Sequence, residues 1–404
     1  MLEERRKKKI LIGCSSAINE GKGILTYSKI LAESLNQDYE IHFYSKKAND
    51  LAWFEANRIK YIHFDVANTS KQNVLELKTY ICENKIDYII NNDVIYINIL
   101  KPAIETPVVN VFHLTRYAIL SCALLNEKYI NRHIVISNDM LKTVCSKKID
   151  ISKVTKILNA INTEDLSYAK KDFTKLRIFC GTENTERKGG KDIIKLIEVL
   201  KQSEINFEFV WIGKKTQKVK DSVVGDDRFT IGLRLPREEF LNVMAKSNIY
   251  LFPSNEEGCP MSLKEAMTQG LVPIAKNSIG AMNEIITHGK DGFLLNSSDW
   301  LKSTKKIIFK FEELEKKLAI MSVNAHEKIK ADFNANRLKN DYIELLNEID
   351  EEANTTTNEK LKKISELTYY DWHRLPYPSS INNFSDFIAR LRYKFGILEK
   401  SNVK

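Results

Sequence analysis

Short apolar runs alternate with amphipathic stretches along the first part of the chain. Residues 8–14 (KKILIGC) and 39–45 (YEIHFYS) have the β-branched and aromatic content of strands, whereas 24–35 (ILTYSKILAESL) repeats its apolar positions at helical spacing. Further elements are expected as strands at 60–64, 87–91, 108–113 and 133–137, and as a helix at 73–84. Because strands that alternate with helices are joined by right-handed crossovers, the pattern predicts a doubly wound parallel sheet.

The alternation starts again at a second strand-like run, 176–182 (LRIFCGT), which precedes a glycine-rich turn and a helix at 190–203. Later strands are expected at 207–214, 228–232, 249–254, 272–276 and 292–296. Two Rossmann-like halves in series are the simplest interpretation of this α/β pattern. We place these domains at residues 1–160 and 161–345.

The remaining residues, 346–404, are predicted to form a linker and a helical C-terminal extension. The stretch 352–360 (EANTTTNEK) is polar, and 381–398 places apolar residues near one helical face with arginine and lysine elsewhere. Such a helix either docks on the body of the protein, which is the commoner arrangement, or lies on an anionic membrane surface. A basic run at 4–9 (ERRKKK) would add to a membrane-facing surface.

Composition is that of a globular protein with at least two domains. The chain has 404 residues, 43% hydrophobic and 28% charged, and no apolar run of membrane-spanning length. The basic N-terminus lacks the apolar segment of a signal peptide, so a cytoplasmic protein is expected. Six cysteines form no C-x-x-C pair and no His/Cys cluster, which argues against a disulfide framework or a zinc site.

The net charge of +9 indicates anionic partners. Nucleotide phosphates and an anionic membrane surface both fit this charge. The basic residues are mostly dispersed lysines without zinc-finger spacing or an RNA-binding signature, so nucleic acid is not an expected partner.

A candidate ligand site follows the strand predicted at 249–254. Ligands bind at the carboxyl ends of strands in such sheets, and SNEEGCPMSLKEAMTQG (254–270) lies at that edge. Pro260 suits the first turn of a helix, whose first amides would form an anion site. These amides belong to Met261, Ser262 and Leu263. Glu257 could accept hydrogen bonds from sugar hydroxyls and Glu265 could hold a ribose, although each alone is more often a solvated surface acid.

A basic turn, NTERKGGK (184–191), lies at the end of another strand in the same half. Arg187 and Lys188 precede two glycines there, so the backbone could approach a pyrophosphate while the cations neutralise it. Alternatively, the glycines serve only the geometry of the chain. The position of the turn, in the same half as Glu257, favours the ligand.

The first half offers weaker signals. The loop NEGKGI (19–24) contains Gly21 and Gly23 but matches neither a dinucleotide fingerprint nor a P-loop. His113 ends the strand predicted at 108–113, and a lone histidine is more often structural than functional.

Together these residues resemble the retaining, GT-B fold glycosyltransferases of family four, the glycosyl transferases group 1. The segment from PSNEEG to DGFLL carries the Glu-x7-Glu pair of that family at Glu257 and Glu265. Other positions in register are Gly258, Ala266, Met267, Gly270, Pro273 and Glu284. KVTKILNAINTEDL (153–166) resembles the interdomain segment of the family, and RKGG (187–190) its phosphate-binding turn. The resemblance covers roughly residues 8–345.

This resemblance implies two Rossmann-like domains facing across a cleft. The second would hold a nucleotide-sugar donor, most simply a UDP-sugar, and the first would hold most of a glycan or lipid-linked acceptor. The family works without a cofactor or a divalent metal, and no D-x-D pair follows a strand here. Bacterial surface polysaccharide synthesis (capsule, lipopolysaccharide or a teichoic-type polymer) is the expected setting, at the cytoplasmic side of a membrane.

The resemblance also implies roles for individual residues. Glu265 would hold the donor ribose and Glu257 the transferred sugar, while Arg187 and Lys188 would stabilise the leaving diphosphate. The donor site is completed by Gly258, Met261, Ser262 and Leu263. His113 would lie near the reacting sugar, which makes His113, Glu257 and Lys188 the expected catalytic residues. Gly21 and Gly23 would let their loop close over the donor.

Three departures from the family pattern bear on the donor pocket and the linker. Gly181-Thr182 stands where many members have Gly-Arg, Asn159-Ala160 replaces Asn-Gly, and Met282-Asn283 replaces Ile-Pro. None of these changes removes the paired glutamates, so an active enzyme is expected. Two alternatives to a glycosyltransferase remain. One is a GT-B fold nucleotide-sugar epimerase, and the other is a catalytically silent sugar-nucleotide or glycan-binding partner.

Overall fold

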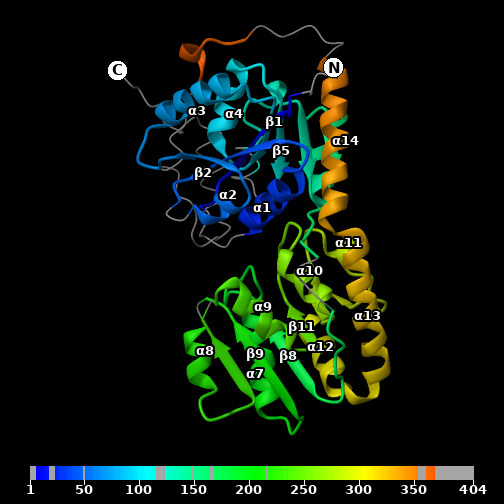
Figure 1. Cartoon of the computed structure of the whole chain (residues 1–404). Helices are drawn as coiled ribbons and strands as arrows, with labels where there is room; N and C mark the ends of the chain where they lie inside the picture. The colour runs from blue at the N-terminus through cyan, green and yellow to red at the C-terminus, as the bar shows by residue number, and fades with distance from the viewer. Residues whose placement is uncertain are drawn as a thin grey trace. The chain divides into compact units, whose positions relative to one another are not determined.

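The computed structural model describes residues 6–17, 23–48, 51–114, 120, 123–147, 149–163, 168–214, 216–233, 235–353 and 361–368. The chain divides into two compact units. Unit 1 comprises Met1–Ile136, Met140–Ile157 and Leu338–Lys404, and unit 2 comprises Ser137–Asp139 and Leu158–Arg337. Each unit is built on its own parallel sheet (Figure 1).

Within the described residues, unit 1 has a seven-stranded sheet of order β3-β2-β1-β4-β5-β6-β7. The strands are β1 (Lys9–Cys14), β2 (Glu40–Lys46), β3 (Lys60–Phe64), β4 (Tyr88–Asn92), β5 (Val108–Phe112), β6 (Arg132–Val135) and β7 (Val154–Lys156). The helices are α1 (Gly23–Leu35), α2 (Ala52–Ala56), α3 (Ser70–Asn84), α4 (Ile95–Leu100), α6 (Asn138–Cys145) and α14 (Ala335–Ala353). The strand order reverses between β1 and β4, the place where doubly wound sheets bind ligands.

The middle strands of this sheet are buried along their whole length. β4 reads YIINN and β5 reads VVNVF, and such near-continuous apolar runs are typical of strands covered on both faces. Two of the polar exceptions pair with each other, because Asn91 Nδ2 donates to Asn110 Oδ1 at 3.0 Å and the two residues are paired in the parallel register. A buried amide without such a partner would destabilise the core.

Unit 2 has a six-stranded parallel sheet of order β10-β9-β8-β11-β12-β13 in its described part. Its strands are β8 (Leu176–Cys180), β9 (Phe207–Ile212), β10 (Phe229–Gly232), β11 (Ile249–Phe252), β12 (Val272–Asn277) and β13 (Phe293–Asn296). Its helices are α7 (Gly190–Lys201), α8 (Gln217–Ser222), α9 (Arg237–Ala245), α10 (Met261–Thr268), α11 (Met282–Ile285), α12 (Trp300–Phe309) and α13 (Glu315–Asp332). On α7, residues at i, i+3, i+4 and i+7 are buried: Ile193, Leu196, Ile197 and Leu200.

The predicted architecture of two Rossmann-like α/β domains is confirmed. Each predicted strand is present within one or two residues, apart from residues at the carboxyl ends that continue as loops. The short strand β7 was missed, because its three residues were interpreted as part of the segment that joins the domains.

The end of the second domain differs from the prediction at residue 345. From Leu338 onward the chain belongs to unit 1 again, because α14 packs against that unit. Tyr342 is fully buried, and its hydroxyl forms a hydrogen bond with that of Tyr27 on α1. The Tyr88 hydroxyl donates to Asp350 Oδ1 at 2.5 Å. Residues 354–360 and 369–404, which contain most of the predicted linker and all of the predicted tail helix, lie outside the described residues.

The described part of the basic N-terminal run is bound to unit 1. Arg6 pairs with Asp87 at 2.8 Å, and Lys8 pairs with Asp350. Lys7 and Lys9 donate to backbone carbonyls. None of the helices in the described ranges combines the length and apolarity needed to cross a membrane.

A buried histidine predicts how unit 1 responds to acid. His133 on β6 is fully buried, and neither ring nitrogen has a hydrogen-bond partner. Burial, helped by the Lys153 charge, lowers its pKa from 6.5 to about 4. The unfolded chain therefore binds a proton more readily, and stability present above pH 6.5 is lost as the pH falls toward 4.

We expect His133→Gln to reduce this acid-dependent loss, which is about 1.4 kcal/mol per pH unit for one such group. Urea unfolding at a series of pH values measures it. His63→Gln, at an exposed position on β3, is the matched control and should keep the wild-type dependence. If the free energy of unfolding falls with pH equally in wild type and His133→Gln, the prediction is wrong.

Candidate functional site

Three loops meet at the carboxyl edge of the unit 2 sheet. They follow β8, β11 and β12, which are consecutive neighbours in the strand order. Asn255 N donates to Arg187 O at 2.8 Å, which links the first two loops. Glu257 N donates to Ile279 O at 3.0 Å, which links the second and third. The adjacency of the strands therefore brings together segments that are about 70 and 20 residues apart in the chain.

A cluster of three charged side chains lies where these loops meet. Lys188 Nζ lies 2.5 Å from Glu257 Oε1, and Arg187 Nη1 lies 3.7 Å from Glu257 Oε2. Arg187 also donates to the carbonyl of Glu256 at 3.0 Å. The sequence predicted one site for Arg187, Lys188 and Glu257, and the structure places them in direct contact.

Glu257 is held ionised by its two cations. Its side chain is only 9% exposed, and burial by itself would raise the pKa of the carboxyl. The Lys188 ammonium and the Arg187 guanidinium outweigh burial and keep that pKa below its ordinary value. The cluster carries two positive charges and one negative charge, so a net positive charge faces any ligand at this edge.

The start of α10 lies beside the cluster. The helix begins at Met261, with Pro260 as its N-cap rather than in its first turn as the sequence suggested. Helix geometry leaves the first amides, those of Met261, Ser262 and Leu263, without acceptors inside the helix, so their dipoles favour an anion. Gly258, just before the helix, accepts a hydrogen bond at its carbonyl from Ala281 N at 2.8 Å.

Glu265 lies on α10 with its side chain 4% exposed. Arg237 Nη1, at the start of α9, lies 2.8 Å from Glu265 Oε1, but its N–H groups are not aligned for a hydrogen bond with that oxygen. The Arg237 side chain is 55% exposed, so it covers the carboxylate from the solvent side. The sequence analysis missed this arginine, although its signal was present as a cation directly after the loop that follows β10.

Lys264, the residue before Glu265, was also missed. It is fully buried, and its ammonium donates to Asn159 O at 2.7 Å and lies 3.4 Å from Cys259 Sγ. Burial lowers its pKa. The bond to Asn159 ties the helix of Glu265 to the segment that enters unit 2 after residue 157.

Two glycines permit the loops to approach each other. Gly189 has φ +71°, and a Cβ there would lie 2.1 Å from Pro253 O. Gly280 has φ +125°, and a Cβ there would lie 2.1 Å from Glu257 O. A side chain at either position would separate the loops as well as strain the backbone.

A smaller polar group lies at the carboxyl ends of β4 and β5 in unit 1. His113 is 5% exposed, and its Nε2 donates to Asn92 Oδ1 at 3.0 Å. Burial lowers the pKa of His113 to about 3, so the ring is neutral at physiological pH. Asp93, directly after β4, was missed by the sequence analysis; its Oδ1 is buried without a hydrogen-bond partner, and burial raises its pKa to about 7.

Two predicted site residues remain, the glycines of the first-domain loop. Gly21 lies outside the described residues, and Gly23 is the first residue of α1 rather than part of a loop. Within the described ranges, no group of three or more His, Cys, Asp or Glu side chains could hold a metal ion.

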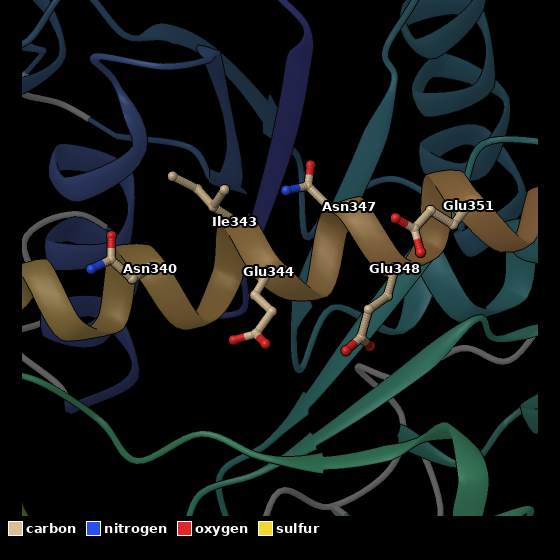
Figure 2. A pocket seen from close by; sticks show the side chains of 6 residues that line it. All are labelled: Asn340, Ile343, Glu344, Asn347, Glu348 and Glu351. Carbon is tan, nitrogen blue, oxygen red and sulfur yellow. The ribbon is translucent and has the colours of Figure 1, made fainter.

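A hollow of about 390 Å³ lies along α14 in unit 1 (Figure 2). Its lining consists of Asn340, Ile343, Glu344, Asn347, Glu348 and Glu351. Glu344 and Glu348 point to the same side of the helix (Figure 2). This lining contains none of the predicted site residues and is acidic, so it is unsuited to an anionic nucleotide.

Residues 161–328 match the family model described as Glycosyl transferases group 1. This segment, somewhat less than half of the chain, is similar to the glycosyl transferases group 1. The match includes Arg187, Lys188, Glu257 and Glu265, so the charged cluster lies inside the matched segment. The predicted resemblance to the glycosyl transferases group 1 is thereby confirmed over residues 161–328.

Individual relatives agree with this assignment. An uncharacterized glycosyltransferase of Methanocaldococcus jannaschii is 26% identical over 232 residues, which are 54% of this chain and 63% of the relative. A UDP-Gal:alpha-D-GlcNAc-diphosphoundecaprenol alpha-1,3-galactosyltransferase of Escherichia coli is 31% identical over 114 residues, which are 27% of this chain and 29% of the relative. The chain thus spans less than two thirds of these curated relatives.

A solved structure shares the fold. The Anabaena protein HepE, in complex with UDP, aligns with a TM-score of 0.70 at 16% identity, covering 84% of this chain and 100% of HepE. The predicted GT-B fold is confirmed by this and similar glycosyltransferase structures.

The close approach at Gly189 gives a test of the loop geometry. We expect Gly189→Ala to lower the free energy of unfolding by more than about 1 kcal/mol, because it adds a clash with Pro253 O to the strain of a positive φ. Gly225→Ala is the matched control: Gly225 has φ +87°, but a Cβ there would meet nothing within 4 Å. Equal losses in the two variants, measured by chemical denaturation, would show that the approach to Pro253 does not matter.

Proposed function

We propose that this protein is a glycosyltransferase that moves a sugar from a nucleotide-sugar donor, a UDP-sugar, to a glycan or lipid-linked acceptor. The observation that carries the proposal is the Lys188–Glu257–Arg187 cluster beside the first turn of α10. A net positive, partly buried site next to helix amides is suited to a diphosphate. A carboxylate in the same place is suited to sugar hydroxyls.

Binding of the donor requires the cluster to exchange partners. The diphosphate would draw Lys188 and Arg187 from Glu257, which frees the carboxylate to accept hydrogen bonds from the transferred sugar. Glu265 would accept the ribose hydroxyls once Arg237 moves aside, since Arg237 is largely exposed and bound only from the solvent side. Fixed cations at the diphosphate would supply the charge stabilisation that a metal ion supplies in other transferases.

We further propose that transfer retains the anomeric configuration. The bond between the anomeric carbon and the phosphate oxygen breaks, the acceptor hydroxyl oxygen bonds to that carbon on the same face, and its proton passes to the leaving phosphate. No protein group needs to act as a strong base in this scheme. His113 fits it as a neutral group, because with Nε2 donating to Asn92 its Nδ1 is left to accept a hydrogen bond from a sugar hydroxyl.

The setting that we propose is bacterial surface polysaccharide synthesis at the cytoplasmic face of a membrane. The Escherichia coli relative is named for a UDP-sugar donor and a lipid-linked acceptor, which supports this class of substrate. The route to the membrane would be the basic, aromatic segment 381–398, because the described part of the N-terminal basic run is already bound to unit 1.

The test of the donor site begins with thermal shift against UDP-, GDP-, CMP- and dTDP-sugars, since a ligand of the folded state raises its stability. With the best donor, Lys188→Ala and Glu265→Ala should each weaken binding by about 1.5–3 kcal/mol, as expected for a lost charged hydrogen bond. Isothermal titration calorimetry measures this. Lys175→Ala, which removes an exposed pair with Glu208 in the same unit, is the control and should leave affinity unchanged.

Unchanged binding in both site variants would refute the site assignment. Product analysis by NMR with a supplied acceptor then decides the reaction: a new glycosidic bond with the donor's anomeric configuration supports the proposal. A 2-epimer formed without an acceptor indicates an epimerase, and binding without turnover indicates a silent partner.

Membrane association is tested by co-sedimentation with vesicles. We expect the full chain to bind vesicles that contain anionic lipid and to be released by salt, because clustered basic residues each contribute about 1 kcal/mol near such a surface. A chain ending at residue 368 should remain in the supernatant. Equal binding by the two chains would exclude the C-terminal segment as the anchor.

A further inference from the structure

Lys276, near the end of β12, lies beside the loops that carry the charged cluster. The sequence did not indicate a role for it. It is 4% exposed. Its ammonium lies 2.5 Å from Asp192 Oδ2 and 2.7 Å from Asn255 Oδ1, and 5.9 Å from the centre of the Trp300 ring. The ammonium is thus surrounded by two hydrogen-bond acceptors and an aromatic face.

A buried ammonium is a costly way to stabilise a fold. Removing the charge from water is unfavourable and pairing only partly offsets that, so apolar side chains of similar size usually stabilise a core as well or better. An ammonium offers directed hydrogen bonds to more than one segment, which an apolar side chain lacks. The identity of these segments therefore indicates what Lys276 does.

Both partners belong to the loops of the charged cluster. Asp192 is in the first turn of α7, directly after the turn of Arg187 and Lys188, and its amide donates to Gly189 O at 3.0 Å. Asn255 precedes Glu257 by two residues in the loop after β11. Lys276 thus connects the two loops that carry opposite charges of the cluster.

Asn255 extends this connection to the backbone of the basic turn. Its Nδ2 donates to Glu186 O at 2.7 Å and its N–H donates to Arg187 O at 2.8 Å. A single buried cation therefore orients Asn255, whose side-chain amide bonds the carbonyl of Glu186 and whose backbone N–H bonds that of Arg187, next to Lys188. None of these bonds involves the side chains of Lys188 or Glu257.

We propose that Lys276 is a positioning residue for the diphosphate site. It holds the backbone of residues 186–189 against the loop of Glu257 through Asn255 and Asp192. This matters when the cluster changes partners, because the Lys188–Glu257 ion pair, which also joins the two loops, is broken by an incoming diphosphate. The proposal rests on the proposed function for its ligand, but the geometry that it assigns exists without one.

The first test uses the ligand-free protein and therefore does not depend on the proposed function. In Lys276→Met, hydrogen exchange should become faster at the amides of Gly189, Gly190 and Asn255, which bond within and between these loops. Asn255→Ala keeps the Lys276–Asp192 pair and should give the same increase at residues 186–190. Lys328→Met is the matched control, since Lys328 pairs with the buried Asp291 elsewhere in unit 2.

The second test uses UDP and UMP as probes. A loop-positioning role predicts that Lys276→Met loses about tenfold in affinity for UDP, while binding of UMP, which lacks the second phosphate, changes much less. Lys276→Arg, which keeps a cation with several donors, should recover most of the loss. Lys328→Met should bind both nucleotides as the wild type does.

The outcomes separate the two proposals. Unchanged exchange in residues 186–190 of both Lys276→Met and Asn255→Ala overturns the positioning role, whatever the ligand. Equal losses for UDP and UMP, or no rescue by Lys276→Arg, overturn its link to the diphosphate. A wild-type protein that binds no nucleoside diphosphate refutes the proposed function, and the exchange measurements then still decide whether Lys276 holds the loops.

Discussion

The burial of one carboxylate determines the arrangement of the unit 2 site. Glu257 is almost fully removed from solvent, and an unpaired charge in that position would cost several kcal/mol. Lys188 and Arg187 supply the compensating charge, but they lie on a different loop, so the loops after β8 and β11 must come together. The backbone can come that close only because position 189 has no side chain. The ion pair, the glycine and the strand order are thus parts of one constraint.

This constraint also explains why the site is suited to a ligand that carries both negative charge and hydroxyl groups. A cluster with one excess positive charge is stable without a ligand, because each side chain has a partner, yet it attracts an anion with more charge than one carboxylate. In the proposed complex with such an anion, Glu257 would become an acceptor in the same small volume. The buried network around Lys276 would keep the backbone in place through that exchange, so little reorganisation would accompany binding.

The sequence was informative wherever the signal was local. Apolar periodicity identified the strands of both sheets except β7, and the Glu-x7-Glu spacing with the Arg187–Lys188 turn identified the residues that meet in the cluster. Contacts between side chains on different loops could not be predicted from such local signals. Which loops become neighbours in space decides that Arg237 pairs with Glu265. The same holds for Lys276 and its partners Asp192 and Asn255, because a single lysine near the end of an apolar strand does not indicate which loops will lie beside it. The return of α14 to unit 1 was missed for the same reason, because an amphipathic helix does not show which surface its apolar face will cover.

The path of the chain has a consequence for how the protein is made. Unit 2 is complete in sequence once Arg337 has been synthesised, apart from three residues supplied earlier. Unit 1 is not, because Tyr342 and Asp350 of α14 are its partners for Tyr27, Tyr88 and Lys8. Although unit 1 contains the N-terminus, it can reach its final packing only after unit 2 has left the ribosome. The order of folding during translation is therefore expected to run against the order of the sequence, with unit 2 formed first.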